Sequence, residues 1–486
     1  MVATLQRWWP FALVALAALW LRTHELARRP MHADEANQAV KLGELLETGR
    51  YAYDPGDHHG PTLYYAALPI AWLRGQRTLA ALDETTVRLV SALAGTLGVL
   101  LLAALVMPPA PSPSNGLGRW PALAAAAFMA VAPPAVYYSR YFVQETLLVT
   151  FTLAALVCAQ RWWRTGRGSW ALGAGACAGL MQATKESAPL FALAALIALA
   201  AVRPPAPTSS RRARDALLAA LAAVMVAALF YSSFGAHPAG LRDALAAYGH
   251  AWTRANGDSG HEKPGWYYLR LFAWQRTGGL VFEQLAFFAL ALAGAIVAVA
   301  SGKKLLRWAA VYTAIVVAAL SLTPYKTPWH AVHLVPGFAL LAAGALAALP
   351  RWRIATVIGV AALALQTVQT SRVAFAYPAD ERNPYAYVHS SPDVLKFRPL
   401  AEAALSRAPD RPVRVIGEEY WPLPWYLRGL PRVGYWSAPP ADCDGALVIV
   451  SAGEVGAVRA RLHGAYRESF LGLRPGVVCV VFTPSP

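Results

Sequence analysis

Residues 329–349 read WHAVHLVPGFALLAAGALAAL, a run with no aspartate, glutamate, lysine or arginine. A helix needs about 17–25 mostly apolar residues to cross a hydrocarbon core about 30 Å thick. Helices in soluble proteins rarely run this long without a charged residue. The stretch therefore predicts a membrane-spanning helix, and several stretches like it occur in the chain.

The composition of the whole chain points the same way. Of its 486 residues, 57% are hydrophobic and 14% are charged, whereas a soluble domain carries roughly 25% charged residues. No small-residue cleavage site precedes Arg22, so the N-terminal run is interpreted as a retained span rather than a signal peptide. We predict a mainly α-helical, polytopic bundle of about eleven spans, at residues 8–22, 85–107, 120–137, 141–160, 169–183, 186–202, 214–233, 280–300, 305–322, 329–349 and 352–373.

The formal charge of +16 is distributed in a way that predicts orientation. The excess lysine and arginine lies in short loops with almost no acid, which is typical of cytoplasmic loops and not of a nucleic-acid groove. We therefore expect no nucleic-acid partner, a multi-pass protein of the cytoplasmic (inner) membrane, and a cytoplasmic N-terminus. The cationic loops contain Arg119; Arg161, Arg164 and Arg167; Arg203, Arg211, Arg212 and Arg214; Lys303, Lys304 and Arg307; and Arg351 with Arg353.

The remaining connections then face outward, and the polar clusters without a topological role all fall on that side. The longest is the first outer loop, residues 23–84. Within it, apolar residues spaced i, i+3, i+4 predict a surface helix that follows Asp34 and stops at Gly49. A second apolar run, residues 63–73, is too short to span and is expected to be interfacial or re-entrant.

The chain is expected to divide into a transmembrane domain, residues 1–373, and a small extracytoplasmic α/β domain, residues 374–486. Strand-like runs occur at 413–416, 446–450 and 477–482, with helical character between 453 and 462. Outside the cytoplasm a disulfide between Cys443 and Cys479 is permitted.

Asp34 stands where the surface helix begins. An aspartate there can cap backbone N–H groups, and the helix dipole favours its ionised form. The alternative interpretation is a general base that orients an acceptor hydroxyl at the mouth of a membrane cavity. His32 and Glu35 either support that role or are simply solvated.

The segment Asp57-His58-His59-Gly60-Pro61 gathers a carboxylate and two imidazoles beside a tight turn. It is interpreted as a polar loop, as a phosphate contact, or as a divalent metal site shared with Asp34. The spacing matches no structural zinc pattern. A divalent metal is therefore possible in principle but has no support in the sequence.

Three basic side chains lie near span ends on the predicted outer side. Arg140, Lys185 and Lys326 suit a phosphate or pyrophosphate, and ionisable groups at such places usually face a cavity. The alternative is membrane anchoring, or ion pairing with the nearby acids Glu145 and Glu186.

The order of these motifs resembles membrane-embedded glycosyltransferases of the GT-C type, which include protein O-mannosyltransferases and aminoarabinose lipid A transferases. In that superfamily an acidic pair follows the first span, and His32-Ala-Asp34-Glu35 matches it. The other counterparts are Asp57-His58-His59-Gly60-Pro61 for a D-x-H-P-P loop, Ser139-Arg140-Tyr141 with Glu145, Gly175 to Lys185, and Lys326 before a late span.

More narrowly, the whole chain is similar to the membrane proteins termed flippase activity-associated. Two departures from the mannosyltransferase pattern leave the sugar and the acceptor open, namely Glu145 in place of aspartate and His59-Gly60-Pro61 in place of His-Pro-Pro. The shared stretches are Tyr53-Asp54-Pro55, residues 59–65, Thr184-Lys185-Glu186, Lys326-Thr327-Pro328-Trp329 and residues 422–428.

The resemblance implies an inverting transfer of a sugar from a polyprenyl-phosphate-linked donor to a lipid, glycan or protein acceptor on the outer face of the membrane. No cofactor is implied, because the lipid carries the activated sugar. Asp34, with Glu35, would position and deprotonate the acceptor hydroxyl. The donor would be bound by His58, His59, Arg140, Glu145, Lys185 and Lys326, with Glu145 orienting Arg140 or the sugar, and with His32, Asp57, Glu186, Trp329 and His330 in secondary positions.

Two other classes of function stay open. A cavity rich in cations also suits a flippase or transporter for the same lipid-linked sugar, although no internal repeat of the kind common in transporters is evident. A non-catalytic accessory subunit, with the C-terminal domain as an interaction module, is the third possibility. Trp329 is equally compatible with an interfacial aromatic belt.

Overall fold

The computed structural model describes residues 2–57, 59–107, 117–204, 210–257 and 260–485. His58, one of the predicted donor-binding residues, lies outside them. The chain forms two compact units: the first contains Met1–His24, Arg50–Ala66 and Arg88–Tyr377, and the second contains Glu25–Gly49, Ala67–Val87 and Pro378–Pro486. The first outer loop therefore contributes to both units.

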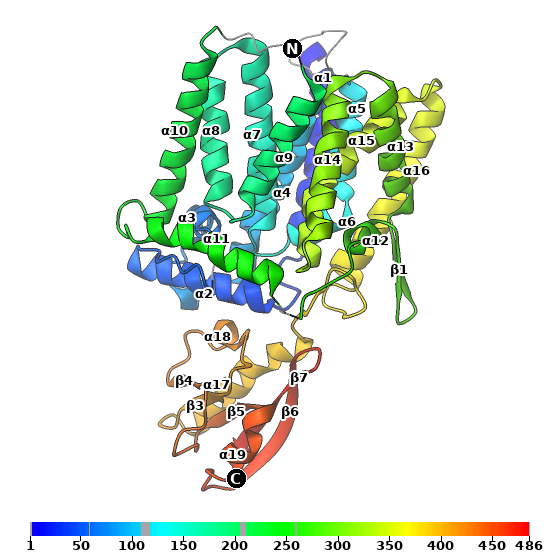
Figure 1. Ribbon diagram of the computed structural model, residues 1–486. Coiled ribbons are helices and arrows are strands. Elements are labelled where there is room, and N and C mark those ends of the chain that lie inside the picture. The colour runs from blue at the N-terminus through cyan, green and yellow to red at the C-terminus, as the bar shows by residue number, and fades with distance from the viewer. Residues whose placement is uncertain (1, 58, 108–116, 205–209, 258–259, 486) are drawn as a thin grey trace. The chain divides into compact units, whose positions relative to one another are not determined.

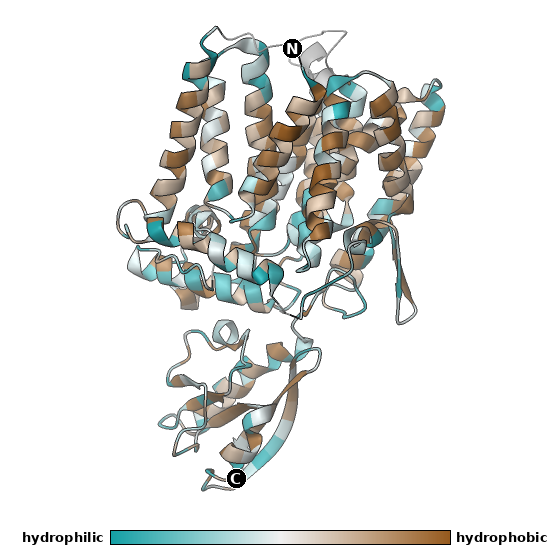
Figure 2. Ribbon diagram, viewed as in Figure 1, coloured by the Kyte–Doolittle hydropathy of each residue, from teal (hydrophilic) through white to brown (hydrophobic). Residues whose placement is uncertain are grey.

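Apolar helices make up most of the first unit, and hydrophilic residues gather toward the helix ends (Figures 1 and 2). Among the described residues, six helical segments are long and apolar enough to cross a membrane, so the protein is a multi-pass membrane protein. They are α4 (Glu84–Val106), α7 (Glu145–Thr165), α10 (Arg212–Tyr231), α14 (Lys304–Leu322), η2 with α15 (Pro328–Ala348), and α16 with η3 (Trp352–Ala376).

Shorter helices complete this unit. Five of them are also apolar and carry 10–17-residue segments: α1 (Val2–Thr23), α3 (Thr62–Leu73), α5 (Arg119–Val131), α9 (Ala188–Val202) and α13 (Leu285–Ala300). The others are α6 (Pro133–Tyr138), α8 (Gly168–Gln182), α11 (Gly240–Asn256) and α12 (Tyr267–Phe272), together with the hairpin β1 (Trp274–Thr277) and β2 (Leu280–Glu283).

Helix α15 (Val335–Ala348) lies at the centre of the first unit, where it packs against α5, α13, α14 and α16. Its approach to α13 depends on Gly294, because a Cβ there would lie 1.9 Å from the carbonyl oxygen of Leu341. In the same way, a Cβ at Gly175 of α8 would lie 2.1 Å from the carbonyl oxygen of Ala219 in α10. Small residues of this kind let membrane helices pack backbone to backbone.

The predicted spans correspond to these helices with two informative differences. The expected span 120–137 is divided into α5 and α6 at Ala132, because Pro133 and Pro134 follow and proline disfavours helical backbone before it. The expected span 280–300 begins as strand β2, and α13 starts only at Leu285. The total of about eleven spans stays a prediction.

The C-terminal part of the second unit is an α/β fold around one mixed sheet. The strand order is β4-β3-β5-β7-β6, with β3 parallel to both β4 and β5, and with β7 antiparallel to β5 and β6. The strands are β3 (Val413–Ile416), β4 (Val433–Trp436), β5 (Leu447–Ser451), β6 (Tyr466–Arg474) and β7 (Val477–Pro484), and the helices are α17 (Phe397–Arg407), α18 (Leu423–Tyr426) and α19 (Val455–Arg459).

Three of these five strands coincide with the predicted strand-like runs. Strand β4 is short and contains Gly434, and the consecutive residues 467–470 of β6 are all exposed, so neither has the continuous apolar pattern of a buried strand. The disulfide suggested for Cys443 and Cys479 is wrong, because both cysteines are free and buried. They fill the sheet's packing as small apolar side chains.

Candidate active site

Lys185 and Glu145 form a buried ion pair in the first unit. Lys185 lies in the short connection between α8 and α9, and Glu145 is the first residue of α7. The Lys185 amino group donates to Glu145 Oε1, and the two side chains are 6% and 3% exposed. Burial opposes the charged amino group, but the carboxylates of Glu145 and Glu186 outweigh it and raise the pKa of Lys185. Lys185 is therefore cationic at neutral pH.

The segment that begins at His59 docks on the same connection. His59 Nδ1 lies 3.0 Å from Glu186 Oε2, and the hydroxyls of Thr62 and Thr184 lie 2.7 Å apart. Gly60 permits this contact, because a Cβ there would lie 2.3 Å from the carbonyl oxygen of Ala183. The glycine that departs from the His-Pro-Pro pattern thus has a packing reason.

The charges around Glu186 keep it ionised. Burial alone would raise its pKa, but His59 and Lys185 outweigh this effect and hold the pKa of Glu186 well below its usual range. The structure thus pairs Glu145 with Lys185 and Glu186 with His59. Glu145 is bonded directly to Lys185, and the expectation that it orients Arg140 or the sugar stays a prediction.

Lys326 is held by a short β-bridge and by its own turn. Its backbone N–H donates to the carbonyl of His261 at 3.0 Å, and its amino group donates to the carbonyl of Thr323. Trp329 follows, with its ring edge-on to the buried Tyr138 at a centroid distance of 6.5 Å. Trp329 therefore packs against the protein on at least one side.

His330 connects this turn to the charged cluster formed by Lys185, Glu145, Glu186 and His59. Its Nδ1 lies 3.2 Å from the hydroxyl of Tyr268. It is also close enough to Lys185, His59 and Glu186 for electrostatic interaction. Four predicted site residues from three separate segments, His59, Lys185, Glu186 and His330, thus come together in one unit.

Arg140 has a different set of contacts. Its guanidinium donates to the carbonyl oxygens of Leu21 and His24 at 3.1 and 2.5 Å, and it stacks on the ring of Phe375 at 4.7 Å. These bonds satisfy carbonyl groups at the C-terminal end of α1, which has no intrahelical donors left for them. Binding of a phosphate by Arg140 stays a prediction.

The second unit contains the acidic pair at the start of α2 (Ala33–Thr48). The predicted cap is wrong, because His32 rather than Asp34 is the N-cap: His32 Nδ1 accepts from the Asp34 backbone N–H at 3.1 Å, and Glu35 accepts from the His32 backbone N–H. The predicted stop at Gly49 is confirmed, in the left-handed conformation. His32 Nε2 faces the carbonyl of Tyr387 at 3.1 Å, so the neutral ring carries its proton on Nε2.

The two carboxylates of this pair have unlike surroundings. Glu35 is fully buried and accepts from Arg29 Nη2 at 2.9 Å, so it is not solvated. The side chain of Asp34 is 51% exposed and sits in the first turn, where the helix dipole stabilises a negative charge. Glu35 therefore holds the helix start in place, and Asp34 is the carboxylate that a ligand can reach.

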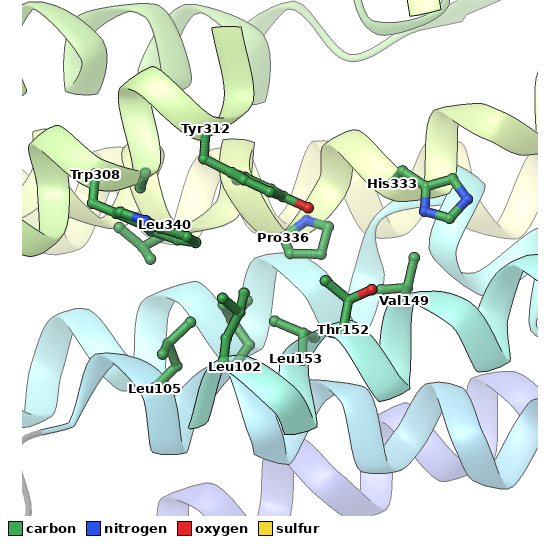
Figure 3. Close-up of a pocket in the computed structure, with 13 residues that line it drawn as sticks. Leu102, Leu105, Val149, Thr152, Leu153, Trp308, Tyr312, His333, Pro336 and Leu340 are labelled. Atoms are coloured by element: carbon green, nitrogen blue, oxygen red, sulfur yellow. The ribbon is translucent and has the colours of Figure 1, made fainter. Parts of the chain in front are cut away.

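An apolar pocket lies inside the first unit (Figure 3). Its volume is about 30 Å³, and His333, which is close enough to Lys185 for an electrostatic interaction, lies at one end of it. His333 is 5% exposed, its ring stacks on Phe191 at 4.2 Å, and its Nε2 has no hydrogen-bond partner among the described residues. The other lining residues are mainly apolar side chains of α4, α7, α14 and α15, namely Leu102, Leu105, Val149, Leu153, Leu156, Pro336 and Leu340, with Trp308, Tyr312 and Thr152.

Two members of this region were not assigned to the site from the sequence. His333 lies in an apolar run, where a lone polar residue is commonly a packing residue. Tyr268 follows Trp266 and Tyr267, and such an aromatic group suits an interfacial belt as well as a sugar contact. The metal site suggested for Asp57 with Asp34 gains no support: within the described ranges, the set of His, Cys, Asp and Glu side chains close enough to share an ion is Asp442, Asp444 and His463.

One protein family matches part of the chain. The sequence profile of the family described as Dolichyl-phosphate-mannose-protein mannosyltransferase matches residues 70–232. The matched stretch includes Arg140, Glu145, Lys185 and Glu186, but neither Asp34 nor Lys326. None of the curated protein sequences matches the chain.

Solved structures match the chain along almost its whole length. ArnT from Cupriavidus metallidurans, bound to undecaprenyl phosphate, has a TM-score of 0.67 at 16% identity, over 97% of both chains. The archaeal oligosaccharyltransferase AglB from Archaeoglobus fulgidus, in complex with an inhibitory peptide and a dolichol-phosphate, has a TM-score of 0.57 at 13% identity, over 96% of this chain and 73% of that one. The chain thus has an ArnT-like fold.

Residues 70–232 match a mannosyltransferase family model, and the chain as a whole has the fold of solved membrane glycosyltransferases of the GT-C type. The predicted resemblance to this class is confirmed, and the matching proteins are glycosyltransferases, in agreement with the predicted kind of enzyme. Among solved structures the likeness to ArnT extends over both units of the chain.

Proposed function

We propose that this protein transfers a sugar from a polyprenyl-phosphate-linked donor to an acceptor on the outer face of the cytoplasmic membrane, with inversion at the anomeric carbon. The observation that carries the proposal is the charged cluster, in which the buried pair Lys185–Glu145 lies with the half-buried pair His59–Glu186 near an apolar pocket. The matched structures of ArnT and AglB, described as bound to undecaprenyl phosphate and in complex with a dolichol-phosphate, support the class of donor.

The charged cluster suits a lipid phosphate. A buried ion pair is costly to desolvate and is weak evidence for a purely stabilising role. Lys185 offers a compact cation that stays protonated, and His59 and His330 offer ring nitrogens near it. A donor phosphate would accept hydrogen bonds from these groups, which would also stabilise the charge that develops on it as the sugar leaves. Arg140 and Lys326 are proposed as further phosphate contacts.

The apolar pocket suits the isoprenoid chain of the donor. Its walls are leucine, valine and proline side chains, and such a surface favours a hydrocarbon over water. His333 lies at one end of the pocket (Figure 3) and is close enough to Lys185 for an electrostatic interaction. The phosphate would lie at the charged cluster, and the helices around the pocket would have to move apart to admit the first isoprene units, because the cavity volume is about 30 Å³.

Asp34 is proposed as the general base. In this step the acceptor hydroxyl oxygen bonds to the anomeric carbon while the bond from that carbon to the phosphate oxygen breaks. The electron pair of the broken bond goes to the phosphate, and the hydroxyl proton goes to Asp34. Its exposure and its place in the first turn of the helix leave the carboxylate within reach of substrates.

Sidedness is part of the proposal. We place the N-terminus in the cytoplasm, and we place Asp34, Lys326 and the C-terminal domain outside. Single cysteines at positions 34 and 326, in a chain whose native cysteines are replaced by serine, should both react with a membrane-impermeant maleimide applied from the outer side. Reaction of one of them only after the membrane is permeabilised would reject the proposal.

The direct test is turnover by purified protein in detergent with a polyprenyl-phosphate-linked sugar. Asp34→Asn should lower the rate at least about 100-fold, the loss typical for removal of a general base. The matched control is Glu44→Gln, which removes an exposed carboxylate from the same helix. Normal turnover by the Asp34 variant would show that the base is assigned wrongly.

The same assay separates the enzyme from the other two classes. An enzyme transfers or releases sugar without a sealed compartment, whereas a flippase needs vesicles with an inside and an outside. An accessory subunit would show neither activity, and variants of its C-terminal domain would lose a partner without loss of chemistry. Sugar movement that occurs only in sealed vesicles would replace the proposed enzyme by a transporter.

A further inference from the structure

A second depression lies in the C-terminal domain, at the carboxyl ends of the parallel strands β3 and β4. It is lined by Glu418, Tyr420, Tyr435, Trp436 and Ser437, and its volume is about 320 Å³. This size falls within the range of about 300–1,000 Å³ that is usual for small-ligand pockets. Ligands of α/β sheets bind preferentially beyond the carboxyl ends of parallel strands. The position and size are therefore those of a binding site.

The ring of Trp436 is fixed in place by its neighbours. Gly434 lies two residues before it on β4, and a Cβ there would lie 2.2 Å from the indole, so only a glycine lets the ring lie over the strand. Arg414 of β3 stacks on the indole at 5.0 Å and donates to the carbonyl of Asp444 at 2.7 Å. A ring held in this way loses little conformational freedom when a ligand binds.

The two tyrosines present aromatic surface at the same place. The centroids of Tyr420 and Tyr435 lie 5.4 Å apart, and Tyr435 is 38% exposed on an edge strand. The turn that carries Tyr420 is anchored at Gly417, where φ is 115° and a Cβ would lie 2.4 Å from the Ser451 hydroxyl. The strained turn brings the aromatic side chain to the end of the sheet.

The two acids of this turn differ. Glu419 forms an ion pair with Arg474, and its backbone carbonyl accepts from the Ser451 hydroxyl. The carboxylate of Glu418 lines the depression, is exposed, and has no hydrogen bond or ion pair within the part of the chain that the structure describes. The hydroxyl of Ser437 lies in the same lining. The site thus combines aromatic faces with one available carboxylate and one hydroxyl.

We propose that this depression binds a neutral hexopyranose unit of a glycan. A pyranose ring has a face of C–H groups that packs on the electron-rich face of an aromatic ring. Its edge carries hydroxyl groups, which donate to a carboxylate and exchange hydrogen bonds with a serine. The carboxylate of Glu418 disfavours phosphorylated or acidic sugars and nucleotides. Binding here is separate from the sugar transfer proposed above, and it requires no residue of the charged cluster.

The test uses the full-length protein in nanodiscs without sugar-headed detergent. Saturation-transfer difference NMR is recorded with the methyl glycosides of glucose, mannose and galactose as probes. At least one should give a signal. Glu418→Gln should weaken its binding about tenfold, which corresponds to loss of a hydrogen bond to a charged group. Tyr435→Ala should weaken it about tenfold as well, because it removes a stacking face.

Matched variants keep the outcome decisive. Phe470→Ala removes a ring that is 67% exposed elsewhere in the same domain and should leave binding unchanged, and Tyr435→Phe should retain it. Turnover of the donor lipid, measured in parallel, reports on the proposed sugar transfer and should be unchanged in Glu418→Gln and Tyr435→Ala. Absence of signal with all three glycosides would overturn the proposal. So would a signal that persists at full strength in both Glu418→Gln and Tyr435→Ala.

Discussion

Removal of one member of the buried Lys185–Glu145 pair is expected to destabilise the membrane unit strongly. The two side chains are 6% and 3% exposed, so neither charge is well solvated when its partner is lost. Removal of a single partner from a buried pair costs about 3–5 kcal/mol. The two single variants should differ, because Glu186 also interacts with Lys185. Lys185→Met leaves two carboxylates without the lysine, so its loss of stability should lie near the upper limit of this range. In Glu145→Gln the lysine still has Glu186 nearby, so the loss should lie near the lower limit.

The double variant Lys185→Met/Glu145→Gln should recover most of the lost stability, because replacement of a whole buried pair by neutral groups is often close to neutral. Unfolding is followed by tryptophan fluorescence during heating of the purified protein. A loss of several kcal/mol should lower the Tm by roughly 5 °C in a chain of this length. The double variant should nevertheless be inactive, since it lacks the cation proposed for the donor phosphate.

An exposed pair serves as the control. Glu25 and Arg28 are bonded at 2.8 Å but have side chains that are 40% and 63% exposed, and Glu25→Gln should change the Tm little. The reasoning is refuted if the double variant loses as much stability as the sum of the single variants, or if Lys185→Met unfolds at the temperature of the unmodified protein. Either result would mean that the two charges do not compensate one another in the folded state.

Three further outcomes follow from the same contacts. The folded-state pKa of Glu186 lies below its unfolded value, which is near 4.3. The stabilising contribution of this carboxylate is therefore present at neutral pH and is lost as the pH falls below about 4 through the folded pKa. Glu186→Gln should lower the Tm at pH 7 and make less difference at pH 3, and an equal difference at both pH values would contradict this. Gly60→Ala should lower the free energy of unfolding by about 1–3 kcal/mol, because its Cβ would meet a backbone carbonyl at 2.3 Å. Gly249 has open space around it, so Gly249→Ala should cause no loss of stability in the same thermal scans. Glu35→Gln should destabilise the protein by about 3 kcal/mol, because Arg29 loses a buried carboxylate; a variant with normal Tm and lost turnover would instead give Glu35 a chemical role.

The sequence by itself determined that this is a multi-pass, mainly helical membrane protein. Whether a segment crosses a bilayer depends on local composition and length, and a run such as residues 329–349 carries that information without any tertiary context. The stop of α2 at Gly49 is likewise local, because the residue there must adopt a positive φ. The resemblance to GT-C glycosyltransferases also rested on short motifs in order along the chain.

Only the tertiary structure decided which side chains meet. Lys185 and Glu145 are 40 residues apart, and His59 and Glu186 are 127 apart, so no local pattern distinguishes these pairs from the alternatives. The order of His32, Asp34 and Glu35 likewise does not say which of them caps the helix, since that depends on the backbone angles at His32 and on the burial of Glu35 against Arg29. Hydrophobic patterning places a helix in the membrane, but hydrogen bonds and ion pairs between distant segments form only after the helices have packed.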